Sequence, residues 1–235
     1  MGRVEWVAGR SEAGSPRLLA ALWLADAAFV VLYVTHATTP WLGHPVFSIS
    51  TDRGLAEWFQ YLKFGWIALA FTTVARTRGE RTYLAWAAAF VCLLVDDALS
   101  IHERAGAVLA ARFGFAPMLG LRPEDFGELI VVGAIGTTLF MLVGAAYRWG
   151  SGEFRRRSAV LLALLALLAV AGVVADMAHV IFDEPRWLRG ALAIAEDGGE
   201  MAVASVICWY ASGLRARALD ARAIPVAGKG SVEAA

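Results

Sequence analysis

Apolar segments long enough to cross a lipid bilayer recur six times along this chain. About 20 apolar residues in a helix match the hydrocarbon thickness of a bilayer. Inside lipid the backbone must satisfy its own hydrogen bonds, so segments of this length are expected to be helices. The sequence therefore predicts an all-α polytopic membrane protein, a six-transmembrane-helix bundle with approximate spans at 18–37, 55–75, 82–102, 126–147, 158–182 and 187–213.

The overall composition agrees with that class. Of 235 residues, 59% are hydrophobic and 18% are charged, with a mean hydropathy of +0.59, whereas soluble proteins average about 25% charged residues. The formal net charge is zero and no basic stripe is present, so we do not expect nucleic acid as a partner. Cys92 and Cys208 both lie inside apolar segments, where we interpret them as packing residues rather than as a disulfide.

Positive charge is distributed unevenly between the two sets of loops. The N-terminal segment, the 2–3 and 4–5 loops and the C-terminal tail together hold fourteen Lys and Arg residues, whereas the other three loops hold six. The positive-inside rule then places both termini in the cytoplasm. We expect a cytoplasmic segment at 1–17, the transmembrane domain at 18–214 and a flexible cytoplasmic tail at 215–235, in the plasma (inner) membrane.

Acidic residues interrupt four of the six segments, each time near the predicted outer end. The third and fifth segments run outward and carry acids late, whereas the fourth and sixth start outside and carry acids early. An acid at the centre of a membrane helix costs about 2.5–3.5 kcal/mol on insertion scales, so these side chains should face the bundle interior. The residues concerned, with two histidines beside them, are Asp96, Asp97, His102, Glu103, Glu128, Asp176, His179, Glu196, Asp197 and Glu200.

These ten residues have the composition of a metal site. Asp176 and His179 have i, i+3 spacing, and Glu196 and Glu200 have i, i+4 spacing, so each pair shares one helix face. Helix bundles build dinuclear sites from inward-facing Glu residues and Glu-x-x-His pairs. Mixed Asp, Glu and His ligation suits zinc, iron or manganese. The sequence predicts one or two divalent ions, Zn or Fe with Mn as a third option, on the extracytoplasmic side, with all ten residues as candidate ligands.

A metal-dependent membrane enzyme is the function that this site favours. The metal could activate water for hydrolysis, or a di-iron centre could oxidise a lipid-soluble or extracytoplasmic substrate, with membrane lipid as the surrounding partner. Ser100, one turn beyond Asp96, is a candidate hydrogen-bond donor at the site. The alternative is a metal, cation or proton-coupled transporter in which Gly198 and Gly199 break a helix at the ion site. A b-type haem between His102 and His179 is disfavoured, because a ring of carboxylates is a poor haem pocket.

Several of these residues also have simpler interpretations. The third helix could end earlier, leaving the amphipathic sequence ALSIHERAGAVLAARFGF on the membrane surface. Glu128 lies in the first turn of a predicted helix, where the helix dipole favours an acid. His102 could likewise cap a helix or lie at the surface. If the third helix ends earlier, Asp96 and Asp97 are solvated at the membrane interface.

One cation, Lys63, lies well inside a predicted segment. A single lysine cannot balance this many acids, so the remaining charge requires either protonation or bound cations. Glu57, Gln60 and Lys63 lie on one helical stripe and can pair with one another. Asp26, the only acid of the first segment, is interpreted as a hydrogen bond between helices.

Overall fold

The computed structural model describes residues 14–118, 121–174 and 185–223, and every long element in this part of the chain is a helix. The elements, in chain order, are α1 (Pro16–Thr38), two short 3₁₀ turns (Pro40–Leu42 and Pro45–Phe47), α2 (Leu55–Arg78), α3 (Tyr83–Leu99), α4 (Ile101–Phe113), α5 (Pro123–Trp149), α6 (Gly152–Ala169), η3 (Val170–Val174), α8 (Arg186–Ala193), η4 (Ile194–Gly198) and α9 (Gly199–Ala223). The all-α prediction is confirmed for these residues.

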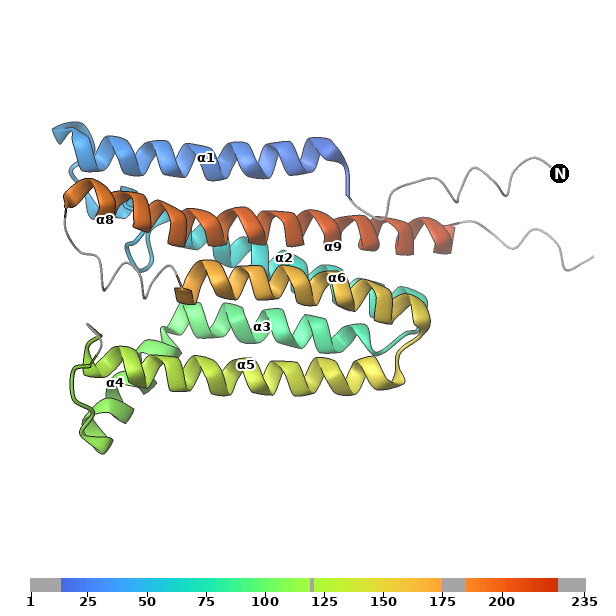
Figure 1. The fold of residues 1–235 in the computed structure, drawn as a ribbon. Helices are drawn as coiled ribbons and strands as arrows, with labels where there is room; N and C mark the ends of the chain where they lie inside the picture. The colour runs from blue at the N-terminus through green and yellow to red at the C-terminus, as the bar shows by residue number, and fades with distance from the viewer. Residues whose placement is uncertain (1–13, 119–120, 175–184, 224–235) are drawn as a thin grey trace, which may run out of the picture.

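The long helices run side by side and form a bundle (Figure 1). Helix α2 packs against both α3 and α9 and so occupies the centre, whereas α1 packs on α9 and α5 packs on α4 and α3. A buried aromatic cluster fills the half of the bundle where α3 and α6 begin. In this cluster Phe71 lies 6.3 Å from Tyr83, Trp86 and Phe90, measured between ring centroids, and Tyr83 lies 5.0 Å from Phe154.

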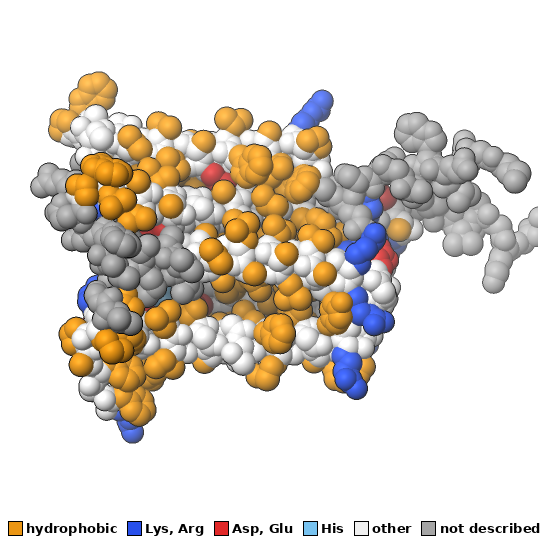
Figure 2. Space-filling view, viewed as in Figure 1, with side chains coloured by type: hydrophobic (Ala, Val, Ile, Leu, Met, Phe, Trp, Pro, Cys, Tyr) orange, Lys and Arg blue, Asp and Glu red, His pale blue; other side chains and the backbone are white. Residues whose placement is uncertain are grey.

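Helix α1 buries an acid and exposes its apolar residues. Of its 23 residues, all of which the structure describes, the buried one is Asp26, while Leu24 and Val31 are 71% and 63% exposed. A soluble protein would bury the apolar residues and expose the acid. Apolar side chains likewise cover the visible faces of α1, α6 and α5 (Figure 2). A surface of this kind is suited to lipid rather than to water.

Two helices, α1 and α5, are long and apolar enough to cross a membrane. The pair α3 and α4 also qualifies if its two halves form one span, although they are bent by 65°. In the described residues, the other predicted segments are helical as well, but they do not meet the same test of length and apolar composition. Helix α9 continues to Ala223, so part of the segment predicted as a flexible tail is helical.

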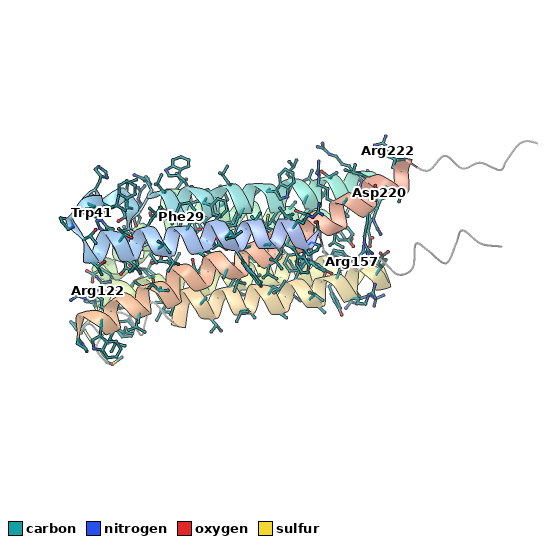
Figure 3. All side chains as sticks on the ribbon, turned by 90° about the horizontal axis from the view of Figure 1, so that it is seen from above. Phe29, Trp41, Arg122, Arg157, Asp220 and Arg222 are labelled. Atoms are coloured by element: carbon teal, nitrogen blue, oxygen red, sulfur yellow. The ribbon has the colours of Figure 1, made fainter. Side chains whose placement is uncertain are left out.

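Arginines gather at one end of the bundle, where α1 and α6 begin and α2, α5 and α9 end. Figure 3 shows Arg157 and Arg222 toward this end, and Trp41 and Arg122 at the other. Arg157 is buried and donates to the Tyr83 hydroxyl at 3.1 Å. Around it, in the described part of the chain, this end carries Arg17, Arg76, Arg78, Arg81, Arg148, Arg155, Arg156, Arg215, Arg217 and Arg222.

Candidate functional site

The third predicted span is broken at Ser100. Helix α3 ends at Leu99, Ser100 adopts a left-handed conformation with φ 46°, and α4 then leaves at an angle of 65°. The prediction of a single helix over 82–102 was therefore wrong, and the alternative in which the third helix ends earlier is closer to the structure. The turn places the start of α4 back over the end of α3, which brings His102 to Asp96.

Asp96 stabilises this break with both of its carboxylate oxygens. Its Oδ1 accepts the backbone N–H of His102 at 3.0 Å, and its Oδ2 lies 3.0 Å from the His102 Nδ1. The first N–H groups of a helix have no partner within the helix, so the buried carboxylate of Asp96 acts as a cap for α4. It also orients the imidazole, whose Nε2 lies 3.9 Å from the Glu103 carboxylate.

Asp97 faces the start of α2. The hydroxyl of Tyr61 lies 3.4 Å from the backbone carbonyl of Asp97 and also donates to the carboxylate of Glu57. Glu57 in turn accepts the backbone N–H of Arg53. The loop before α2, the first turns of α2 and the end of α3 are thus joined by hydrogen bonds at the same end of the bundle that carries the α3–α4 break.

Glu200 lies against a π-helical turn of the neighbouring helix. The two such turns in the described residues, η3 and η4, contact each other. A Cβ placed on Gly172 of η3 would meet the Glu200 carboxylate, and one on Gly199 would come within 3.4 Å of Ala171. The glycines therefore permit α6 and α9 to approach closely at this level. Turns of this type insert an extra residue, redirect the side chains that follow, and are frequent at functional sites.

The carboxylates of α3, η4 and α9 interact electrostatically. The charge of Glu200 interacts with those of Asp97, Asp197, Glu196 and His102, and the charge of Asp97 interacts with those of Asp96, His102, Glu57 and Glu103. Asp197 also accepts a hydrogen bond from the Ser50 hydroxyl. Most of the acids singled out in the sequence thus form one connected polar region at one end of the bundle.

Glu128 lies at the contact between α5 and α4. It is half-buried in the second turn of α5, and its backbone and Cγ lie against Gly106 of α4. At the very start of α5, the Asp125 carboxylate caps the helix by accepting the backbone N–H of Arg122 at 2.7 Å. It also accepts hydrogen bonds from the Arg122 guanidinium, which raise the pKa of that group. Asp125, an acid not selected from the sequence, therefore has a capping role that its position three residues after the N-cap could have indicated.

The described residues test the prediction of a metal site only in part. Within residues 14–118, 121–174 and 185–223, no group of three or more His, Cys, Asp or Glu side chains is arranged to hold a metal ion. Asp176 and His179, the i, i+3 pair of the fifth segment, lie outside the described residues. The polar region described above is therefore a set of interacting acids with one oriented histidine.

The buried lysine is engaged next to this region. Lys63 Nζ lies 3.1 Å from Asp26 Oδ1 and donates to the Met201 carbonyl at 2.8 Å. Ser205 lies 3.3 Å from Lys63 and donates to the other oxygen of Asp26 at 2.6 Å. Asp26 does join helices, as expected, but the expected pairing of Lys63 with Glu57 and Gln60 was wrong. The partners of Lys63 lie on α1 and α9, so helical spacing within α2 could not identify them.

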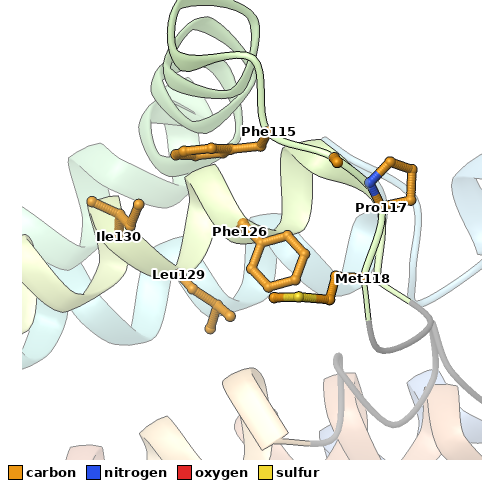
Figure 4. Close-up of a pocket in the computed structure, with 7 residues that line it drawn as sticks. Phe115, Pro117, Met118, Phe126, Leu129 and Ile130 are labelled. Carbon is orange, nitrogen blue, oxygen red and sulfur yellow. The ribbon is translucent and has the colours of Figure 1, made fainter.

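An apolar pocket of about 550 Å³ lies beside the first turns of α5 (Figure 4). It is formed between that helix and the loop that follows α4. On α5, Glu128 lies about 160–200° around the helix from Phe126 and Ile130, so the pocket and the acids occupy different faces. The lining residues are Phe115, Ala116, Pro117, Met118, Phe126, Leu129 and Ile130. The pocket offers contact to an apolar group and no reactive side chain.

The described residues define an all-helical protein, some of whose helices are apolar enough to be compatible with a membrane. The chain belongs to the family described as a domain of unknown function, DUF8692, which matches residues 18–216. Comparison with the curated proteins and with the solved structures finds no match. The matched range begins in α1 and ends in α9.

Proposed function

We propose that this protein is a six-span protein of the plasma (inner) membrane, with both termini in the cytoplasm, that holds one or two divalent metal ions in the outer half of its bundle. Zinc or iron is the first choice and manganese the next, because the ligands would be carboxylates and imidazoles. The observation that carries the proposal is Glu200. Its carboxylate lies against the π-helical turn at Gly172 and interacts with the charges of Asp97 and His102.

Charge balance supports a bound cation. The buried cation nearest to these acids in the described part of the chain, Lys63, is already engaged by Asp26, Met201 and Ser205. Carboxylates at membrane depth are costly unless they are neutralised or paired. Asp176 and His179 follow η3 in the sequence, and the proposed ligand set requires these two residues together with Glu200 and the acids of α3 and η4.

An enzyme is supported more strongly than a transporter. Beyond Lys63, the half of the bundle toward the arginine-rich end is filled by the aromatic cluster around Phe71, and Trp86 donates to Ser158 within it at 2.9 Å. A transporter needs a polar route through both halves, whereas a hydrolase or di-iron oxidase needs access from one side. The substrate would be lipid-soluble or extracytoplasmic, and the apolar pocket beside α5 is suited to hold an acyl chain near the same end.

Elemental analysis of the purified protein tests this proposal. We expect zinc, iron or manganese at about one or two ions per chain, as in mono- or dinuclear sites. E200Q and the double variant D176A/H179A should lose most of the metal. D220N, which removes an acid near the far end of the same helix as Glu200, should retain it. Wild-type protein without any of these metals, or full metal content in D176A/H179A, would exclude the proposed site.

A further inference from the structure

Gln60 is a buried amide whose hydrogen-bonding groups have no partner within the described chain. Gln60 is 5% exposed, and neither its Nε2 nor its Oε1 forms a hydrogen bond within the described chain. Buried polar side chains are almost always hydrogen-bonded, and each exception calls for an explanation such as a bound ion or water. A donor and an acceptor left together on one side chain indicate that something polar binds between α2 and its neighbours.

The contacts of the adjacent residues fix the direction of Gln60. Tyr61 reaches the Asp97 carbonyl on α3, and Lys63 reaches the Met201 carbonyl on α9. At 100° per residue, Gln60 lies about 100° from Tyr61 on one side and about 60° from Lys63 on the other. Its side chain therefore faces the space that α2, α3 and α9 enclose.

Two carboxylates border the same space. Glu200 precedes Met201, the residue that Lys63 contacts, and its charge interacts with both Lys63 and Asp97. The backbone carbonyl of Asp97 lies 3.4 Å from the Tyr61 hydroxyl of α2, and the charge of the Asp97 carboxylate interacts with those of Glu57 on α2 and Glu200 on α9. The interior thus presents acids from α3 and α9, and the amide of Gln60 from α2, at one level of the bundle.

We propose that Gln60 is a positioning residue of the cation site, which hydrogen-bonds a cation-bound water and a carboxylate ligand at the same time. The Oε1 accepts from the water, and the Nε2 donates to Asp97 or Glu200. This arrangement satisfies both amide groups, whereas direct ligation through Oε1 would satisfy only one. Groups that hold the ligands of a metal in place typically change its affinity by about 10–100-fold when removed. The inference rests on the proposed metal function.

Binding of Mn²⁺ to the purified full-length protein tests the proposed role of Gln60. The protein is first stripped of metal, and the added Mn²⁺ is then detected by electron paramagnetic resonance. Q60L should weaken Mn²⁺ binding by about 10–100-fold. In the absence of metal, Q60L should unfold at the same or a higher temperature, because it removes two unsatisfied buried groups. A purely structural glutamine would give the opposite result, lower stability. Q60E should change the affinity as well, since its charge would lie next to the ion.

T72V is the matched control, because Thr72 lies on the same helix and its hydroxyl bonds only to Ala68 of its own backbone in the described contacts. This variant should leave the Mn²⁺ affinity unchanged. If the wild type binds Mn²⁺ and both Q60L and Q60E bind it equally well, the role of Gln60 is overturned while the metal function stands. If the wild type binds neither Mn²⁺ nor Zn²⁺ nor Fe²⁺, the metal function fails and this inference fails with it.

Discussion

At the scale of single residues, the pair of Asp26 and Lys63 shows how the bundle accommodates charge. The two side chains come from α1 and α2, are 8% and 2% exposed, and lie 3.1 Å apart. Ser205 and the Met201 carbonyl complete their hydrogen bonds from α9. Three helices are thus held in register by one polar cluster, and α1 has few other buried contacts to hold it.

Removal of one member of this pair should be more harmful than removal of both. K63M or D26L alone leaves a buried charge without its partner, which typically costs about 3–5 kcal/mol. The double variant D26L/K63M should lose clearly less than the sum of the single variants. Unfolding in detergent, analysed as a double-mutant cycle, measures the coupling. Additive losses would show that the pair does not act as a unit.

The residues of the polar region differ in how far the sequence predicts them. Acids inside apolar segments are conspicuous, and the positive-inside rule places them at one end, so most of the cluster follows from the sequence. The roles do not follow. Asp96 binds His102 only because the chain turns at Ser100, and Lys63 reaches Asp26 across 37 positions of sequence. Such partners depend on tertiary packing, which helical periodicity does not specify.

At the scale of elements, the backbones of α4 and α5 approach each other closely. A Cβ on Gly127 would meet the carbonyl group of Gly106, and one on Gly106 would meet the backbone of Glu128. Small residues at helix interfaces allow this approach in membranes. The contact fixes α4 against α5 and thereby fixes the direction in which the chain leaves the α3–α4 break.

Alanine at this contact should therefore destabilise the protein. G127A should cost about 1–3 kcal/mol, the usual range for overpacking, and should loosen α4. G133A is the matched control in the same helix, because a Cβ there meets nothing within 4 Å. G133A should leave the free energy of unfolding unchanged, or raise it by up to about 1 kcal/mol because alanine has the higher helix propensity. Thermal unfolding of both variants in detergent gives the comparison, and equal stability of the two would contradict the close packing of α4 on α5.

Helix positions were predictable, whereas helix interruptions were not. Each apolar segment in the described part of the chain corresponds to a helix, since length and composition alone determine that choice in lipid. The break at Ser100 and the π-helical turns at η3 and η4 arise where polar side chains and close-packed glycines compete with regular helix geometry. The sequence DGG at 197–199 indicates weakness there, but it does not indicate that the helix continues through a π-helical turn.

At the scale of the whole molecule, the two ends of the bundle differ in charge while its flanks are apolar. The arginines around Arg157 gather at one end, and the acids around Glu200 lie toward the other. Helix α1 exposes Leu24 and Val31 and buries Asp26. In the membrane orientation that we propose, the positive-inside rule places these arginines on the cytoplasmic side. The acids would then face outward, where an extracytoplasmic substrate could reach them.

Cysteine labelling tests this orientation directly. In a C92S/C208S background, R112C in the last turn of α4 and R155C in the first turn of α6 introduce thiols at opposite ends, and both positions are exposed. A membrane-impermeant maleimide should label R112C in intact spheroplasts and should label R155C only after lysis. The exposure of the two sites is similar, so a difference in labelling reports the side of the membrane. Labelling of R155C alone in intact spheroplasts would invert the topology and place the acids in the cytoplasmic half. Labelling of both would argue against a sealed, membrane-spanning bundle, and with it against a site that takes its substrate from the extracytoplasmic side.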